Sequence, residues 1–420
     1  MGSGILSKLK EWSSTPGGQT GIVASVLFAS LLIRFALFPI PGFEVDSGCF
    51  SSWFRTAATG GISGFYDNTS FCDYPPFNVY IFWFFGKMSQ LFGWDTLPFF
   101  IKLPQNLFDL AAAYFIFSML RMRLPFGVSL AGMSLYAFNP AVIFDLAVWG
   151  QMDSIHTFFM VASLFFAFKS RFEISGGLFC LAILTKPQSI ILLPVLAYLI
   201  LRHGGWQRAV SSSVIFGGVL ALVILPFAWD NPVTFLAEQY SGYNVYRYTT
   251  ANAFNVWALV GLWKPDNVSH FGLTYQVWGF LAFLAAALLF FWSYRRHGRS
   301  NAAFLVFILA FAFFMLMTRM HERYLFPVFA FLLLAWPLRL GIWLYVGLTC
   351  TYLANLVVVY MAYGAGGTVP GGAWYVMLIS SANIVLMGIA SGQYWLAHRV
   401  PRPALVSPVL SDEGAVEEEP

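Results

Sequence analysis

Long apolar runs separated by short polar segments occupy most of this sequence. A run of about 20 apolar residues is long enough to form a helix across the hydrocarbon core of a bilayer. The apolar runs that charged residues bound predict twelve membrane-spanning helices, at 19–40, 99–120, 125–147, 151–168, 173–186, 187–201, 209–228, 271–293, 301–319, 323–337, 341–362 and 374–396. The pattern therefore predicts an all-α polytopic membrane protein.

The basic residues orient these helices. If the N-terminus is cytoplasmic, fourteen of the 23 Lys and Arg residues fall on the cytoplasmic side, and every cytoplasmic loop carries at least one, as the positive-inside rule expects. They are Lys8, Lys10, Arg121, Arg123, Lys169, Arg171, Arg202, Arg208, Arg295, Arg296, Arg299, Arg339, Arg399 and Arg402. Both termini are therefore expected in the cytoplasm.

Two apolar stretches do not fit the pattern of simple spans. Treating 77–93 as a full span would invert everything after it, so we expect a re-entrant or interfacial helix inside a long outer loop, 41–98. Pro187 interrupts the apolar sequence around "LTKPQ" (184–188), which predicts two short helices meeting at Lys186–Pro187. Broken backbone at membrane depth is tolerated only where it lines a cavity.

Composition agrees with a membrane protein and sets the domain limits. The chain of 420 residues is 59% hydrophobic and only 10% charged, whereas soluble domains are about 25% charged. We expect a cytoplasmic segment at 1–18, one transmembrane domain at 19–397, and a disordered, acidic cytoplasmic tail at 398–420. No cleavable signal peptide is evident, so the first span is expected to stay as a signal anchor.

The polar residues outside the cytoplasmic loops gather on the opposite face. Six stretches land there: "EVDSG" (44–48), "CDYPPF" (72–77), "WGQMDS" (149–154), "LTKPQ" (184–188), "EQYSGYNVYR" (238–247) and "TRMHERYLFP" (318–327). Ionisable residues in or beside the membrane are costly and mark functional sites. The sequence therefore predicts a site on the outer face, formed with the outer loops 41–98 and 229–270.

The contents of these stretches suggest the chemistry of the site. Lys186, Arg247, Arg319 and Arg323, together with His321, could bind an anion, and phosphate suits Arg forks and Lys point charges. Carboxylates come from Asp46, Asp73 and Asp153, and one of them could act as a general base. This combination suits a sugar carried on a lipid phosphate.

Each of these residues also has a simpler interpretation. Asp46 could be a solvated loop acid, Lys186 a snorkelling residue, and Asp153 a helix cap. Glu322 could form a structural ion pair with Arg323 or Arg319. For Asp73 we favour helix capping or loop anchoring, with Tyr74 facing the lipid or sugar.

Two of the four cysteines lie in the first outer loop. In an oxidising compartment Cys49 and Cys72 could form a disulfide that brings Asp46 toward Tyr74. Cys180 and Cys350 lie within predicted spans.

The order of the motifs resembles a known class of enzymes. An acid in the first outer loop, followed by "DYPPF", "WGQMDS", "LTKPQ" and "MHERYLFP", resembles the GT-C class of polyprenyl-phosphate-sugar-dependent glycosyltransferases over roughly residues 20 to 340. The likeness is greatest to the glucosyltransferases of lipid-linked oligosaccharide assembly and to prokaryotic mannosyltransferase-like relatives. The eukaryotic enzymes have D-Y-P-P, G-H-F-Q-Y-N, H-K-Q-M and H-E-K at the corresponding places.

This resemblance implies a reaction and roles for residues. It implies an inverting single displacement of glucose or mannose from a dolichyl- or undecaprenyl-phosphate sugar, with Asp46 as general base. Lys186, Gln188, His321 and Arg323 would bind the donor phosphate, and Arg247 and Arg319 are expected to bind it too. Substrate contacts are expected from Glu44, which could share the work of Asp46, and from Tyr74, Gln151, Asp153 and Glu322. Gln151 and Asp153 stand where the family has a different polar pair.

The expected surroundings of the enzyme follow from the same resemblance. The membrane would be a bacterial plasma membrane or the endoplasmic reticulum, with the site on the periplasmic or lumenal face. Partners would be the lipid-linked donor, membrane lipid and a glycan, glycolipid or protein acceptor, with no nucleic acid. No cofactor is expected, and no metal-ligand spacing appears in the sequence.

Two other functions stay open at this point. A transporter or flippase of a lipid-linked or anionic substrate would need polar residues on both faces and usually an internal repeat, which this sequence lacks. A polysaccharide polymerase or ligase would rely on Arg and His, so its activity would survive Asp46→Asn but not the loss of His321 or Arg323.

Overall fold

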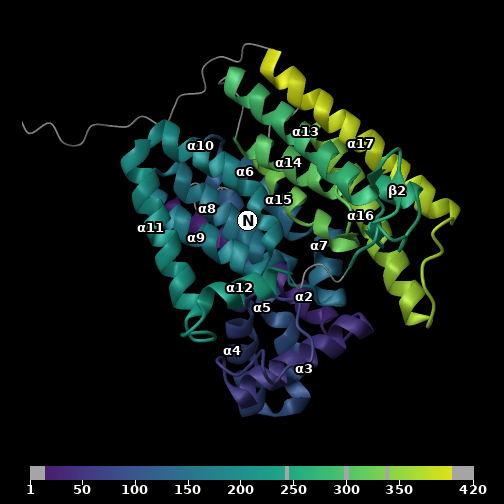
Figure 1. Cartoon of the computed structure of the whole chain (residues 1–420). Coiled ribbons are helices and arrows are strands. Elements are labelled where there is room, and N and C mark those ends of the chain that lie inside the picture. The colour runs from purple at the N-terminus through teal and green to yellow at the C-terminus, as the bar shows by residue number, and fades with distance from the viewer. Residues whose placement is uncertain (1–14, 242–245, 298–301, 336–339, 400–420) are drawn as a thin grey trace, which may run out of the picture.

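The computed structural model describes residues 15–241, 246–297, 302–335 and 340–399 and is almost entirely helical (Figure 1). Most of the predicted N-terminal segment 1–18 and of the predicted tail 398–420 lies outside these residues. The longer helices are α2 (Pro16–Leu37), α3 (Glu44–Gly60), α4 (Pro76–Phe92), α5 (Leu97–Arg121), α6 (Phe126–Ala137), α8 (Asp153–Phe168), α9 (Phe172–Thr185), α10 (Leu193–His203), α11 (Gly205–Ile224), α12 (Pro232–Ser241), α13 (Tyr275–His297), α14 (Ala302–Leu316), α15 (Pro327–Leu334), α16 (Gly341–Gly364) and α17 (Trp374–Arg399).

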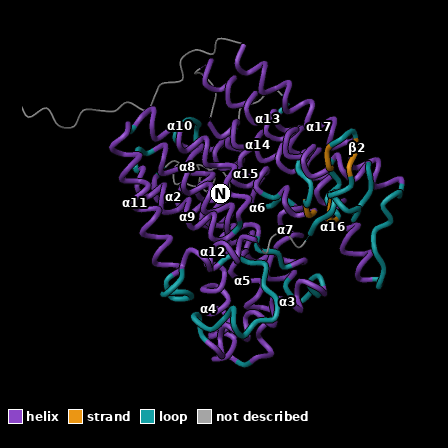
Figure 2. The backbone as a smooth tube through the Cα atoms, in the orientation of Figure 1, coloured by secondary structure: helices purple, strands orange, loops and turns teal. Residues whose placement is uncertain are grey.

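Short elements connect these helices. They are the 3₁₀ helices η1 (Trp94–Thr96), η3 (Pro187–Leu192), η5 (Val256–Leu259) and η6 (Glu322–Leu325), the helix α7 (Pro140–Ile143), the π-helical turn η2 (Phe144–Trp149), and the strands β1 (Thr250–Ala251), β2 (Ser269–His270), β3 (Leu273–Thr274) and β4 (Met320–His321). Figure 2 shows how little of the backbone is strand. The expected all-α class is confirmed.

Every predicted span overlaps a helix of the structure, but the helices differ in length. Five described helices are long and apolar enough to cross a membrane, and a sixth span is formed if the pair 126–137 and 140–149, bent by 41°, counts as one. Several others, such as α8, α9 and α14, are apolar but shorter than 18 residues. The protein is therefore a multi-pass membrane protein, while the number twelve stays a prediction.

The predicted first outer loop, 41–98, contains two helices where the sequence indicated one. The helix expected at 77–93 is α4, which begins at Pro76 after the extended Pro75. The unexpected helix is α3, which packs along α4 so that the two form a hairpin at the lower end of the molecule in Figure 1. Because α3 begins at Glu44, its first turn carries the acids of "EVDSG".

The helical backbone is interrupted between α9 and η3, as the sequence predicts. Helix α9 ends at Thr185, Lys186 is extended with φ −148° and ψ 127°, and Pro187 begins η3. The amide of Asn78 in α4 donates to the carbonyl of Thr185 over 2.8 Å and so satisfies one backbone group at this break. The break leaves Lys186 outside regular helix, beside the start of α8.

A very small parallel sheet fixes the connection between α14 and α15. Thr250 pairs with Met320 and Ala251 with His321 in β1 and β4. The side chain of Asn255 reinforces this arrangement by donating to the carbonyls of Phe314 and Met317. The segment that carries His321 and Arg323 is therefore held by backbone pairing with a distant part of the chain.

One ion pair is completely buried within the helices. Arg34 of α2 and Asp109 of α5 are 2.5 Å apart, and both side chains are 0% exposed. A buried charge is stable only when it is paired, so this contact ties α2 to α5.

Candidate active site

Asp46 lies in the first turn of α3 and is held in one orientation by two donors. Its Oδ2 accepts hydrogen bonds from Nε1 of Trp149, over 2.8 Å, and from Nε2 of Gln151. The Phe43 ring, at the start of α3, stacks on Trp149 with ring centres 4.4 Å apart, and the Phe43 N–H donates to the Trp149 carbonyl. The carboxylate is half-buried, so it is both oriented and accessible.

The segment that leads from α2 into α3 is fastened from two sides. Lys102 of α5 donates to the carbonyls of Phe38 and Ile40 over 3.1 and 2.6 Å. The hydroxyl of Tyr360, in α16, donates to the carbonyl of Pro41 over 2.6 Å. Helices from both halves of the chain therefore set the position from which Asp46 projects.

Lys186 is a buried cation with one carboxylate and two aromatic rings around it. Its ammonium lies 2.7 Å from Oδ1 of Asp153, and 5.7 and 5.4 Å from the ring centres of Tyr74 and Tyr324. Asp153 begins α8, but no side-chain capping bond forms there, so its carboxylate pairs with Lys186 instead. The cation is thereby kept in place at the broken helix.

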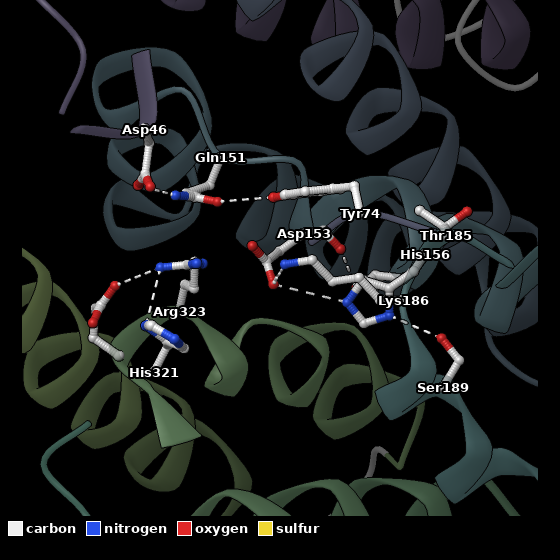
Figure 3. A network of polar contacts seen from close by, with 12 residues as sticks. Asp46, Tyr74, Gln151, Asp153, His156, Thr185, Lys186, Ser189, His321 and Arg323 are labelled. Carbon is white, nitrogen blue, oxygen red and sulfur yellow. Dashed lines mark hydrogen bonds and ion pairs between the residues drawn. The ribbon is translucent and has the colours of Figure 1, made fainter. Parts of the chain in front are cut away.

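The polar chain continues beyond Asp153 to residues that the sequence did not single out. His156 has its Nε2 3.9 Å from Oδ1 of Asp153 and its Nδ1 3.1 Å from Oγ of Ser189, which itself donates to the Ala182 carbonyl. The spacing of Asp153 and His156, three residues apart on one helix, was the available signal. Figure 3 shows this chain on one side of the site and Asp46 with Gln151 on the other.

Arg323 supplies the second cation. Its guanidinium contacts Oε1 of Glu322 over 3.1 Å, Nδ1 of His321 over 3.4 Å, and the Tyr324 ring at 5.7 Å. The His321 ring in turn meets the Tyr246 ring edge-on, with centres 4.7 Å apart. In Figure 3, Arg323 faces Gln151 and Asp46 across the site.

Burial sets the protonation of the two groups next to Arg323. It raises the pKa of Glu322 to about 7, against the opposing effect of Arg323. Burial also lowers the pKa of His321 well below its ordinary value, and the neighbouring Arg323 adds to this effect. At neutral pH, His321 is therefore uncharged and Glu322 is balanced between its two forms.

Arg319 and Arg247 lie around a different acid, Asp266. Arg319 Nε is 2.5 Å and its terminal nitrogen 3.4 Å from the two carboxylate oxygens of Asp266. The backbone carbonyl of Arg247, whose side chain is exposed, accepts from the Asp266 N–H. Arg319 thus forms an ion pair with an acid 53 positions earlier in the chain, a pairing that the sequence pattern did not indicate.

The remaining predicted residues fall at the margins of this site. Tyr74 is buried, and its hydroxyl lies 3.4 Å from Oε1 of Gln151. Gln188 lines a small pocket with Asp153 and His156, and its Oε1 is buried with no hydrogen-bond partner in the described part of the chain. Glu44 is exposed at the start of α3.

Two further acids approach the same space. Burial raises the pKa of Asp73, Arg323 opposes this, and Asp46 adds to it, so these three charges act on one another. Asp73 does not cap α4, where no side-chain capping bond forms. Asp145, in the π-helical turn η2, is 0% exposed, and neither carboxylate oxygen has a hydrogen-bond partner within the described residues.

Cys49 and Cys72 both have free thiols in this structure. Burial raises the pKa of each, and nearby acids add to the effect. The disulfide between them stays a prediction.

Comparison with known protein families identifies the family of this chain. The model of Glycosyltransferase family 87 matches residues 71–318, more than half of the 420 residues. The chain therefore belongs to glycosyltransferase family 87, which confirms that it is a glycosyltransferase. The matched range contains Tyr74, Gln151, Asp153 and Lys186, while Asp46 and His321 lie outside it.

The other two comparisons add less. No curated protein matches this sequence. Among solved structures, the Archaeoglobus fulgidus oligosaccharyltransferase in its apo form is similar, with a TM-score of 0.46 and 13% identity, over 91% of this chain and 56% of that one. This chain thus spans little more than half the length of that protein.

Proposed function

We propose that this glycosyltransferase moves a hexose, glucose or mannose, from a polyprenyl-phosphate sugar to a hydroxyl group of its acceptor. The acceptor is a glycan, glycolipid or protein on the periplasmic or lumenal face of the membrane. The observation that carries the proposal is an oriented, half-buried Asp46 that faces two cations, the buried Lys186 and the partly buried Arg323.

The reaction is a single displacement with inversion. The acceptor hydroxyl attacks the anomeric carbon of the donor sugar and gives its proton to Asp46, while the bond from that carbon to the phosphate oxygen breaks. The lipid phosphate leaves with the electron pair. Asp46 suits the role of base because Trp149 and Gln151 hold one of its oxygens.

The leaving phosphate needs fixed positive charge and hydrogen-bond donors. Lys186 and Arg323 supply the charge, and Gln188 and the neutral His321 supply hydrogen bonds. Arg319, bound to Asp266, supports the loop that carries His321 and Arg323, and the exposed Arg247 lies at the outer edge. No metal is required, because the leaving group is already a stabilised phosphate anion.

The lipid part of the donor would pass the apolar side of the Gln188 pocket. Ile191, Phe313 and Pro327 line this pocket next to Asp153 and His156. An apolar wall beside a buried cation matches a ligand with a phosphate at the end of a hydrocarbon chain.

Replacing the proposed base should stop transfer without preventing donor binding. For Asp46→Asn we expect a fall in kcat of about 10²–10⁴-fold, the usual contribution of a general base. Rates would be measured with purified, lipid-reconstituted protein and a panel of synthetic polyprenyl-phosphate glucose and mannose donors. Asp67→Asn, an exposed acid in the same outer segment, is the matched control and should turn over normally.

The same assay separates the alternatives. Near-normal turnover by Asp46→Asn, with loss of activity in His321→Ala or Arg323→Ala, would instead indicate a polymerase or ligase. Movement of lipid-linked sugar across the bilayer without transfer would indicate a transporter. Glu44→Gln in the same series tests whether Glu44 shares the role of Asp46.

A further inference from the structure

We propose that a row of mostly aromatic side chains beginning next to Asp46 binds the acceptor, and that this acceptor is a saccharide of more than one sugar unit. The row, called here the acceptor row, consists of Phe43, Tyr363, Asn252, Trp263 and Tyr248. This inference rests on the proposed function, because it assigns the second substrate of the same site.

The acceptor row is continuous from the catalytic carboxylate outward. Phe43 stacks on Trp149, the donor to Asp46, and its ring centre lies 5.3 Å from that of Tyr363 in α16. Asn252 then links two aromatic residues: its Nδ2 donates to the Tyr363 hydroxyl over 3.3 Å, and its Oδ1 accepts from Nε1 of Trp263 over 2.9 Å.

The outer end of the row is Tyr248. Its ring centre lies 5.2 Å from that of Trp263. The row therefore consists of two ring-to-ring contacts that the side chain of Asn252 connects, which offers a saccharide more than one aromatic surface. Tyr248, Trp263 and Tyr363 are all half-buried, so each presents part of its surface to a ligand.

The chemistry of the row fits a sugar better than a lipid or an anion. A pyranose has C–H faces that pack on aromatic rings and hydroxyl groups that need hydrogen-bond partners, and Tyr and Trp offer an apolar body with a polar tip. The Tyr363 hydroxyl accepts from Asn252, which leaves its own hydrogen available to a sugar hydroxyl. None of the five side chains carries a charge, so the side chains of the row offer no ion pair to a phosphate.

Backbone strain also marks this row. Asn252 has φ +67° and Trp263 has φ +56°, the left-handed region that a bulky residue such as Trp rarely adopts. Such conformations persist where the surroundings enforce them, and they cluster at ligand-binding sites. Here they accompany the one hydrogen bond that joins Asn252 to the Trp263 indole.

The direction of attack agrees with this assignment. Inversion requires the acceptor oxygen to approach the anomeric carbon from the face opposite the phosphate. The phosphate is assigned to Lys186 and Arg323. The acceptor row begins instead at Phe43, which stacks on Trp149, the residue that donates a hydrogen bond to Asp46. A saccharide lying on the row would thus bring its terminal hydroxyl to Asp46.

The test measures saccharide binding and transfer in two variants of the full-length protein. Tyr363→Leu removes one ring and its hydroxyl, and Trp263→Phe keeps a ring but removes the indole N–H. Mannotriose and maltotriose are the binding probes, measured by saturation-transfer NMR without donor. Alkyl glycosides of the same sugars, as monosaccharides and trisaccharides, are the acceptors in the transfer assay.

We expect the KM for trisaccharide acceptors to rise at least tenfold in Tyr363→Leu, with smaller changes for monosaccharide acceptors and no change in the donor KM. Trp343→Leu, on the same helix but 72% exposed at its other end, is the matched control and should behave as wild type. Folding is checked by retained hydrolysis of the donor in the absence of acceptor.

Several results would overturn the inference. These are an unchanged trisaccharide KM in both row variants, a shift confined to the donor KM, or no binding of either trisaccharide to the wild-type protein. Failure of the proposed function looks different: no polyprenyl-phosphate sugar supports transfer, while trisaccharide binding without donor still depends on Tyr363.

Discussion

Glu322 is the residue whose charge is most finely balanced in the site. Burial raises its pKa to about 7, and its carboxylate lies 3.1 Å from the guanidinium of Arg323. The charge of Asp46 also acts on Glu322 and favours its protonated form. If Arg323 binds the donor phosphate as proposed, ionised Glu322 competes with that phosphate for Arg323, whereas protonated Glu322 leaves Arg323 to the phosphate.

This balance predicts that the donor binds more weakly as the pH rises. The raised pKa means that Glu322 becomes ionised as pH passes through about 7, so affinity should be high below that pH and fall above it. Above this pH, the donor KM can rise by about tenfold per pH unit if ionised Glu322 excludes the phosphate. Donor KM measured between pH 5.5 and 8.5 tests this.

Glu322→Gln should flatten the profile and retain tight binding at high pH. The matched control is Glu173→Gln, which removes an acid from a surface ion pair with Arg208, and this variant should keep the wild-type profile. Burial also raises the pKa of Asp73, so this acid could add a second step to the pH profile. Asp73→Asn removes that step and leaves the one that belongs to Glu322. An unaltered pH step in Glu322→Gln would exclude Glu322 as its source.

At the scale of elements, the hairpin of α3 and α4 depends on close approach at Gly86. A Cβ added there would lie 2.4 Å from the Phe54 carbonyl oxygen and 3.0 Å from the Ala58 Cβ. The obstructing atoms belong to the backbone and to a short side chain, so neither can turn away. Helix α3 would have to move, and it carries Asp46.

Gly86→Ala should therefore lower both stability and activity. Overpacking of this kind costs about 1–3 kcal/mol, which should appear as a lower Tm of the detergent-purified protein. Transfer should fall with it, since the position of Asp46 changes.

Gly217→Ala in α11 is the matched control, because a Cβ there meets no atom within 4 Å. This variant should leave the Tm unchanged or raise it slightly, because Ala is more favourable than Gly inside a helix by about 1 kcal/mol. Equal effects of the two substitutions would show that Gly86 is not a close contact.

For the whole molecule, the distribution of charge predicts an orientation in the membrane. The basic segments such as Arg121–Arg123 are assigned to the cytoplasm, and the site to the opposite face. A green fluorescent protein fused at the C-terminus should fluoresce, and alkaline phosphatase fused there should be inactive. Phosphatase fused after residue 268, near the acceptor row, should be active. The reverse pattern would place the site in the cytoplasm.

Sequence patterns predicted the helical fold well because apolar runs and the Pro187 break act locally. The polar, Ser- and Gly-containing stretch 44–60 offered no such pattern, and its folding into α3 depends on packing against α4. The membrane depth of the short helices is not fixed by hydropathy, because several are too short to be recognised by length.

The site was predictable where polar or charged residues stood out from their apolar surroundings, as for Lys186 and Gln151. Trp149 was missed because an aromatic residue at the end of an apolar run is usually core, and only its indole bond to Asp46 distinguishes it. His156 lies inside an apolar helix. The partner of Arg319 could not be inferred, because 53 residues separate it from Asp266.

The hydrogen bond from the Tyr360 hydroxyl to the Pro41 carbonyl joins positions 319 residues apart. A ribosome making this protein completes the segment around Asp46 long before α16 exists. The nascent chain consequently lacks the hydrogen bond that fastens this segment until α16 has been made and inserted. The enzyme should therefore be inactive during its synthesis until α16 has been inserted and Tyr360 can reach the Pro41 carbonyl.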